Sequence, residues 1–255
     1  MYFDTHAHYD DEYFDEDREV LLASLKENNI SLVLNPGINE ASCLKAVEFA
    51  DKYDYFYAAI GWHPSDVLDF TEKSEQLLYK LAKHPKVKAI GEIGLDYYWT
   101  TDTMDVQKKV FRRQLEIAQE LNLPVIIHDR EAHGDCLDIL RAHKDGLSGI
   151  VHCFSGSYEM ARSCIDLGFV IAFGGALTFK NAVNQRDIAS RLPLECIVLE
   201  TDCPYMTPEP FRGKRNDPSL IRYTCEQLAQ LHHMQPEEIA HITMENGKRI
   251  LDMHI

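Results

Sequence analysis

Basic residues are scarce in this sequence, which has 26 lysines and arginines against 41 aspartates and glutamates and a formal net charge of −15. Binding of nucleic acid that ignores base sequence normally comes from lysine and arginine side chains that neutralise phosphates. The composition therefore excludes a broad basic surface as the means of binding. A phosphate-containing ligand would have to be held by metal ions or by a local basic patch.

Long apolar runs are also absent, so the sequence predicts no membrane-spanning helix. The first residues lack the basic start and apolar stretch of a secretory signal. The seven cysteines are odd in number and contain no Cys-x-x-Cys pair, which argues against a disulfide framework and against a zinc site made of thiolates. We therefore expect a cytoplasmic protein with reduced cysteines.

The 255 residues, of which 45% are hydrophobic, suit one domain spanning 1–255. Eight short apolar or β-rich runs alternate with amphipathic segments of helical spacing, and no linker interrupts the series. Such alternation predicts parallel strands covered by helices, and eight repeats favour a closed (β/α)8 TIM barrel over an open sheet. The eight runs are Met1–Thr5, Ser31–Leu34, Tyr55–Ile60, Val87–Ile90, Pro124–Ile127, Gly149–Val151, Phe169–Phe173 and Cys196–Leu199.

Histidines and carboxylates gather where these runs end, which is where a barrel places its chemistry. His6 and His8, two apart on a strand, would point to the same side. The residues at the ends of the runs are His6, His8, His63, Glu92, His128, His152 and Asp202.

Imidazole nitrogens and carboxylate oxygens are ligands for divalent metal ions. We expect six ligands, which exceed what one tetrahedral ion takes, so the sequence predicts a pair of ions with Glu92 as the shared carboxylate. The predicted ligands are His6, His8, Glu92, His128, His152 and Asp202. His63, which Pro64 keeps extended, is predicted to contact the substrate or a metal-bound water. The alternative is a histidine that only supports the ligands or the fold.

Three loops carry further candidates. The eighth loop, "TDCPYMTPEPFRGKRNDP", holds Arg212, Lys214 and Arg215. It could bind a phosphate, or it could simply be an exposed charged loop, because both have this composition. The aromatic run 97–99 could stack on a base or pack against the rim. Arg130 and His133 could line the mouth or simply begin a helix. Cys203 has no dedicated base, so we do not expect it to act as a nucleophile.

Several motifs together resemble the TatD-type metal-dependent deoxyribonucleases, and the similarity runs essentially from end to end. The matching blocks are "DTHAHYD", "GWHPSD", "AIGEIGLDYYW", "HDREAHGD", "HCFSGS" and "VLETDCPYMTP" followed by "RGKRNDP". The resemblance implies a TIM barrel of the amidohydrolase kind and a Mg2+-dependent nuclease, a 3′ to 5′ exonuclease on single-stranded DNA. It also implies the six metal ligands given above, with His63 facing the phosphate. Cys203 departs from the family, where many members carry serine.

We therefore expect hydrolysis of DNA phosphodiester bonds with two divalent ions per chain. In this scheme Asp202 is both ligand and general base, while His63 and the basic eighth loop orient the phosphate. A histidine-rich site would by affinity take Zn2+ or Mn2+ ahead of Mg2+, so availability would decide the working ion.

Two alternatives remain open. One is a binuclear amidohydrolase acting on a small amide, lactone or ester, although many of those enzymes use a carbamylated lysine where Glu92 stands. The other is a non-catalytic barrel that binds DNA or protein.

Overall fold

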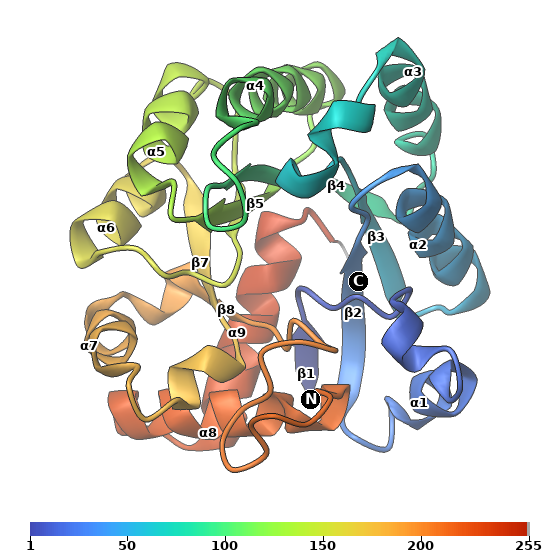
Figure 1. The fold of residues 1–255 in the computed structure, drawn as a ribbon. Helices are drawn as coiled ribbons and strands as arrows, with labels where there is room; N and C mark the ends of the chain where they lie inside the picture. Colours follow the sequence, from blue (N-terminus) through green and yellow to red (C-terminus); the bar gives the residue numbers. More distant parts are fainter. Residues whose placement is uncertain (254–255) are drawn as a thin grey trace.

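Eight parallel strands form one sheet in the computed structural model of the protein, which describes residues 1–253. The strands are paired in chain order from β1 to β8, and helices surround them (Figure 1). This arrangement confirms the predicted TIM barrel. The strands are β1 (Tyr2–Asp4), β2 (Ile30–Pro36), β3 (Phe56–Ile60), β4 (Val87–Asp96), β5 (Val125–Arg130), β6 (Gly149–Val151), β7 (Phe169–Phe173) and β8 (Ile197–Leu199).

The first and last strands meet at the seam of the barrel. The backbone N–H of Thr5 donates to the Leu199 carbonyl at 3.1 Å, and the N–H of Asp202 donates to the His6 carbonyl at 2.9 Å. Beside them the buried carboxylate of Asp4 accepts hydrogen bonds from the N–H and the hydroxyl of Thr201, at 2.8 and 2.7 Å. These bonds fix the end of β1 against the chain that leaves β8.

The helices form the outer layer. Several begin at residues that cap their first turn: the Asn39 side chain accepts from the Ser42 N–H, and the Ser157 side chain accepts from the Met160 N–H. The α-helices are α1 (Arg18–Ser24), α2 (Glu40–Lys52), α3 (Glu72–Leu81), α4 (Met104–Leu121), α5 (His133–Ala142), α6 (Tyr158–Asp166), α7 (Val183–Arg191), α8 (Ile221–His232) and α9 (Pro236–Ile250). The short 3-10 helices are η1 (Glu12–Phe14), η2 (Pro64–Asp69), η3 (Gly175–Thr178), η4 (Leu194–Cys196) and η5 (Pro218–Leu220). Within residues 1–253, no helix is long and apolar enough to cross a membrane.

Alternate residues of each strand face opposite layers of the core. In β5, Val125 and Ile127 pack outward against the helices, whereas Ile126 packs inside the barrel. The inner core also holds Ile150 of β6 and Val198 of β8. The two layers make the barrel a filled core and leave its carboxyl end for polar side chains.

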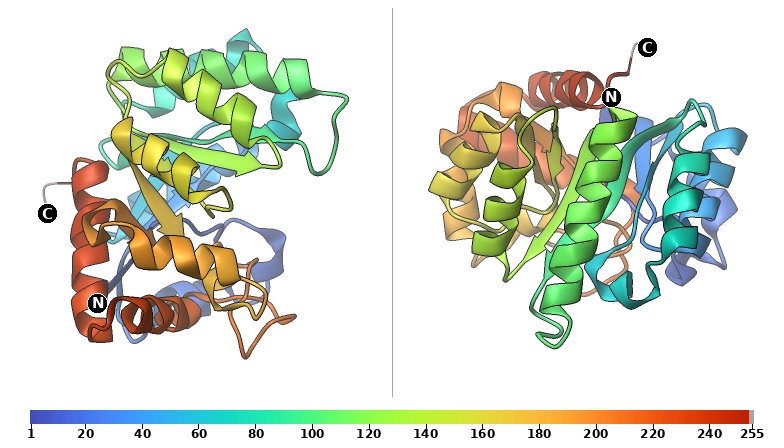
Figure 2. Two further views of the ribbon diagram at one scale, coloured as in Figure 1. Left: turned by 90° about the vertical axis from the view of Figure 1, so that its left-hand side faces the viewer. Right: turned by 90° about the horizontal axis from the view of Figure 1, so that it is seen from above.

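Helix α9 covers the amino end of the barrel. Met244 of α9 and Leu251 just after it pack into the inner core with Phe3 of β1. The helix approaches so closely at Gly247 that a Cβ atom there would lie 2.7 Å from the Phe3 ring. In Figure 2 (left), the loop before α4 and the long loop after β8 project from the opposite side of the molecule. The chemistry-bearing loops therefore share the open end.

Strands β2, β4 and β5 extend further than the sequence predicts, and the extension of β4 and β5 bears on the site. The fourth predicted run ends at Ile90, but β4 continues to Asp96, and the fifth run ends at Ile127, but β5 continues to Arg130. Polar residues interrupted both apolar runs, yet β4 and β5 stay paired there, with Gly94 opposite His128 and Asp96 opposite Arg130. Glu92 and His128 consequently lie on the strands themselves.

Candidate metal centre

Strand alternation aims the polar residues at the axis of the barrel. His128 stands two residues beyond Ile126, and His152 stands two beyond Ile150. Just past the last strand, Glu200 follows Val198 at the same spacing. The inward face of each strand thus changes from apolar to polar at the mouth, which is why residues far apart in the sequence converge there.

His6, His8 and Glu92 form one group. The Nε2 atoms of the two histidines lie 3.1 Å apart. The Oε2 atom of Glu92 lies 3.2 Å from Nε2 of His6 and 3.5 Å from Nε2 of His8. All three residues are buried. Two imidazole nitrogens and one carboxylate oxygen therefore face a common point.

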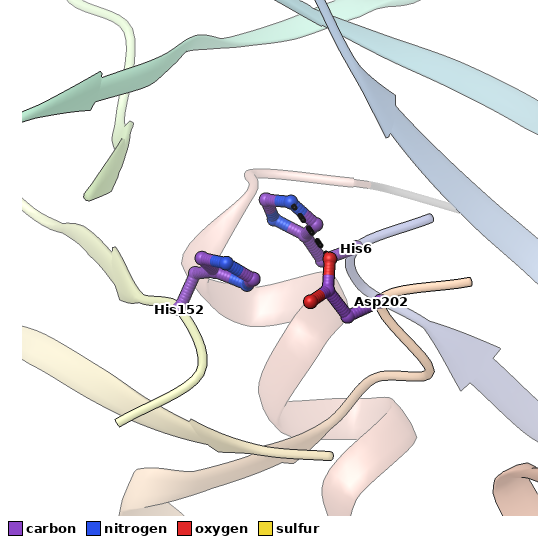
Figure 3. A group of neighbouring side chains, drawn as sticks. All are labelled: His6, His152 and Asp202. Carbon is purple, nitrogen blue, oxygen red and sulfur yellow. Dashed lines mark ion pairs between the residues drawn. The ribbon is translucent and has the colours of Figure 1, made fainter. Parts of the chain in front are cut away.

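A second group joins His6 with His152 and Asp202 (Figure 3). The His6 and His152 rings are stacked, with centroids 3.5 Å apart and planes 14° from parallel. The Oδ1 atom of Asp202 lies 3.9 Å from Nε2 of His6 and 3.8 Å from Nε2 of His8. This group spans the seam between the first and last strands.

The third group contains His63, Glu92 and His128. Nδ1 of His128 lies 2.6 Å from Oε1 of Glu92, and Nε2 of His63 lies 3.7 Å from the same oxygen. The Nδ1 atom of His63 accepts a hydrogen bond from the Ser65 N–H at 3.1 Å, so the neutral ring carries its proton on Nε2. His63 thus presents an N–H donor to the centre.

The three groups together bring all six predicted ligands and His63 to the mouth. The arrangement fits cations. Nδ1 of His6 is buried without a hydrogen-bond partner among residues 1–253, and the nitrogens and oxygens of the groups face one another. Glu92 contacts His6 and His8 with one oxygen and His128 with the other, so its position suits a carboxylate shared by two ions.

Two buried carboxylates that the sequence analysis did not single out hold these histidines in place. Glu200 lies 3.1 Å from Nδ1 of His152, and Asp96 lies 3.1 Å from Nε2 of His128. Carboxylates in such positions fix the orientation and tautomer of a ligand histidine. Strand alternation could have found Glu200, which precedes Asp202 by two residues. Asp96 could be found only once β4 was known to reach it.

Burial and neighbouring charges separate the protonation states of the two central carboxylates. Burial opposes ionisation of Glu92, but the surrounding histidines His6, His152 and His63 hold its pKa well below the usual range. Burial raises the pKa of Asp202 to about 6, against the opposing effect of His152. Glu92 is therefore a fixed anion, while Asp202 titrates near neutrality.

Burial and the neighbouring carboxylates together set the protonation states of His6 and His152 in the metal-free protein. Burial lowers the pKa of His6 to about 4, with help from the charge of His152. Burial opposes protonation of His152 as well, yet Glu200 and Glu92 raise its pKa to about 10. The two stacked rings thus differ in charge.

The basic residues of the eighth loop lie in two different environments. Arg215 forms a two-armed ion pair with Asp17, at 2.8 and 2.6 Å, and donates to the Tyr13 carbonyl, so it ties the loop to the first helices. Arg212 lies over the Phe179 ring at 4.0 Å, and both Arg212 and Lys214 are exposed. These residues line a groove of about 490 Å³. Its other lining residues include Tyr13, Phe179 and Tyr205.

The remaining candidates differ in exposure and in their position relative to the mouth. Tyr97 is half-buried and donates to Asp135, whereas Tyr98 and Trp99 are exposed. His133 begins α5 and pairs with Asp129, which shares a face of β5 with the outward-packing Val125 and Ile127, so His133 does not line the mouth. Burial raises the pKa of the Cys203 thiol well above its usual value, which agrees with the expectation that it is no nucleophile.

An eight-stranded barrel with buried histidine and carboxylate clusters at its carboxyl end has the TIM-barrel amidohydrolase fold. The family model described as "TatD related DNase" matches residues 3–252. The chain therefore belongs to the TatD-related DNase family.

Similar proteins cover the whole chain. An uncharacterized metal-dependent hydrolase of Bacillus subtilis, YabD, is 46% identical over 251 residues, with 98% of each chain covered. The crystal structure of the TatD homologue YjjV from Escherichia coli superimposes with a TM-score of 0.92 at 30% identity, covering 98% of both chains. A TatD-family hydrolase from Entamoeba histolytica gives a TM-score of 0.85 at 25% identity, with 98% and 97% coverage.

Proposed function

We propose that this protein is a divalent-metal-dependent deoxyribonuclease that hydrolyses DNA phosphodiester bonds. The observation that carries the proposal is the convergence of four histidines with Glu92 and Asp202 at one mouth, near the exposed basic side chains of the eighth loop. Membership of the TatD-related DNase family supports the choice of DNA as substrate. The 3′ to 5′ direction and the preference for single strands rest on the family resemblance.

Two ions would be held by the three groups, with Glu92 shared between them. When bound, a pair of divalent ions polarises a phosphoryl oxygen and lowers the pKa of a water molecule. The histidine-rich donor set favours Zn2+ or Mn2+ by affinity, and the resemblance favours Mg2+ as the working ion.

The protein's own side chains would manage the proton and the phosphate. Asp202, whose carboxylate faces His6 and His8, would take a proton from the attacking water. Burial and the charge of His128 lower the pKa of His63 to about 3, so His63 stays neutral and can donate from Nε2 to a phosphoryl oxygen. Arg212 and Lys214 would hold the rest of the strand.

The choice between DNA and a small neutral substrate depends on charge. Exposed Arg212 and Lys214 suit a polyanion, and a small amide, lactone or ester gives them no role. The histidine and carboxylate groups alone do not separate these chemistries, because one fold hosts many reactions.

The test uses protein stripped with EDTA and then supplied with Mg2+, Mn2+ or Zn2+. Single-stranded DNA labelled at its 5′ end, and separately at its 3′ end, is offered beside a panel of esters, lactones and hydantoins. Stepwise shortening of the 5′-labelled strand, absent in EDTA, is expected. Turnover of the panel with intact DNA would overturn the proposal in favour of an amidohydrolase, and binding of metal without any turnover would favour a non-catalytic barrel.

A further inference from the structure

The function proposed above gives no role to a second group of side chains, at the ends of β4 and β5. Trp99 and Tyr98 lie in the loop between β4 and α4, with 71% and 55% of their surface exposed. Their rings meet edge to face, with centroids 4.9 Å apart. Arg130, at the end of β5, places its guanidinium 3.8 Å from the centre of the Tyr98 ring and 5.4 Å from that of Trp99. We call these three residues the rim cluster.

The rim cluster is joined to the metal centre by one carboxylate. Oδ2 of Asp96 lies 3.1 Å from Nε2 of His128. Oδ1 of the same side chain accepts from the backbone N–H groups of Tyr98, at 2.9 Å, and Trp99, at 3.4 Å. The position of the aromatic loop is thereby fixed relative to His128, a predicted metal ligand.

Arg130 belongs to the same inward face as that ligand. It stands two residues beyond His128 on β5, one strand repeat nearer the mouth. Its carbonyl accepts from the Tyr97 N–H at 2.9 Å, which pairs the strand end with the start of the aromatic loop. The end of β5 therefore lies beside the start of the aromatic loop, and the Arg130 guanidinium meets the exposed rings there.

The charge of Arg130 is free for an anion. Within residues 1–253 its guanidinium makes no ion pair or hydrogen bond, whereas Arg191, which lies over the Tyr158 ring at 3.7 Å in a similar way, is paired with Asp187 at 3.0 Å. The chain as a whole carries a net charge of −15. An unpaired arginine whose guanidinium lies over an aromatic ring keeps N–H groups available to a phosphate.

We propose that the rim cluster binds one nucleotide unit of single-stranded DNA, with its base stacked on Trp99 and its phosphate on Arg130. The proposal rests on the nuclease function proposed above and names a subsite for it. Only an unpaired base can stack in this way, so the subsite would make the enzyme prefer single strands. The exposed indole of Trp99 would stack on the base, and the unpaired guanidinium of Arg130 would bind the phosphate.

Tryptophan fluorescence reports on the subsite without any catalysis. The chain has two tryptophans, and Trp62 is buried with 2% of its surface exposed, so a quencher in solution acts on Trp99. In EDTA, a short oligothymidylate is expected to quench the emission, and an abasic oligomer with the same number of phosphates is expected to quench it far less. The variant Trp99→Phe, which leaves only Trp62, should not respond. Equal quenching by both oligomers, or none by either, would overturn the proposal.

Kinetics with the same two oligomers and the working metal provide the second readout. Trp99→Ala is expected to raise KM for oligothymidylate about tenfold and to leave kcat and cleavage of the abasic oligomer nearly unchanged. Arg130→Lys should raise KM for both oligomers, because it keeps the charge but loses the planar fork. Val20→Ala, at an equally exposed apolar position on α1, and Arg191→Lys are the matched controls.

The outcomes separate the two proposals. If the wild-type protein cleaves oligothymidylate and Trp99→Ala cleaves it with the same KM, the subsite is wrong and the nuclease function stands. If the metal-loaded wild-type protein neither binds nor cleaves the oligomer, both proposals fall.

Discussion

Glu200 and His152 form a buried pair in which Oε2 of the carboxylate lies 3.1 Å from Nδ1 of the ring. The other oxygen of Glu200 accepts the N–H of Cys153 at 2.8 Å, so the carboxylate cannot turn away. A proton on Nδ1 directs the lone pair of Nε2 toward the centre, where a cation could use it. Glu200 therefore governs which nitrogen of His152 is available.

This pair predicts that Glu200→Gln weakens metal binding by about 10- to 100-fold. Glutamine can accept the Cys153 N–H, but it then turns its amide toward His152 and favours the wrong tautomer. Isothermal titration with Mn2+ measures the affinity. Glu195→Gln, an exposed position in η4, is the control and should bind as the wild type does. Equal affinities for the two variants would contradict the role of Glu200.

Metal binding should release protons. Burial opposes protonation of His128, but Asp96 and Glu92 raise its pKa to about 9, and His152 has a pKa of about 10. Both are therefore charged at pH 7 without metal, whereas a ligand imidazole must be neutral. Apparent affinity should rise as the pH increases from 7 to 9.

Titrations in two buffers with different heats of ionisation measure the protons released. His133→Gln removes a histidine outside the centre and should leave the release unchanged. Identical apparent enthalpies in the two buffers would show that no proton leaves.

Asp202→Asn should lower turnover by at least about a hundredfold, because the amide cannot accept the proton that Asp202 is proposed to take. The fold should persist, since the backbone N–H of residue 202 still bonds to the His6 carbonyl. Thermal unfolding by circular dichroism checks the fold, and cleavage of labelled DNA checks turnover. Near-normal turnover in a metal-loaded variant would refute the assignment.

Arg212 and Arg215 should respond differently to substitution. Arg212→Ala should weaken DNA binding and reduce its salt dependence by about one charge. Arg215→Ala should instead weaken DNA binding by disturbing the position of the eighth loop. Asp17→Asn breaks the same ion pair from the other side, so it should reproduce this effect. Binding measured across a salt series distinguishes them. If Asp17→Asn binds DNA as the wild type does and Arg215→Ala binds it weakly, Arg215 contacts the substrate directly.

Gly247→Ala should destabilise the protein by about 1–3 kcal/mol, because its Cβ would press on the Phe3 ring where α9 closes the barrel. Gly134→Ala in α5 is the matched control. A Cβ there meets nothing within 4 Å, and alanine favours a helix, so stability should rise by up to about 1 kcal/mol. Urea unfolding of both variants gives the two free energies. Equal changes in the two would mean that α9 is not tightly docked.

The sequence predicts the barrel well because strand and helix periods alternate without interruption. It also places His152 and Asp202 after their strands, because apolar runs end cleanly there. It does not predict that β4 reaches Asp96, since Glu92 and two glycines break the apolar pattern while the pairing with β5 continues. The sequence also does not predict the ion pair between Arg215 and Asp17, because these residues are 198 positions apart.

The barrel seam has a consequence for biosynthesis. Asp4 and Thr201 are 197 positions apart, and the His6 side of the centre meets Asp202 across the same boundary. A ribosome must release nearly the entire polypeptide before both halves of the cation site exist together. Nascent fragments consequently lack a complete centre, and hydrolytic capacity arises only when the last strand docks beside the first.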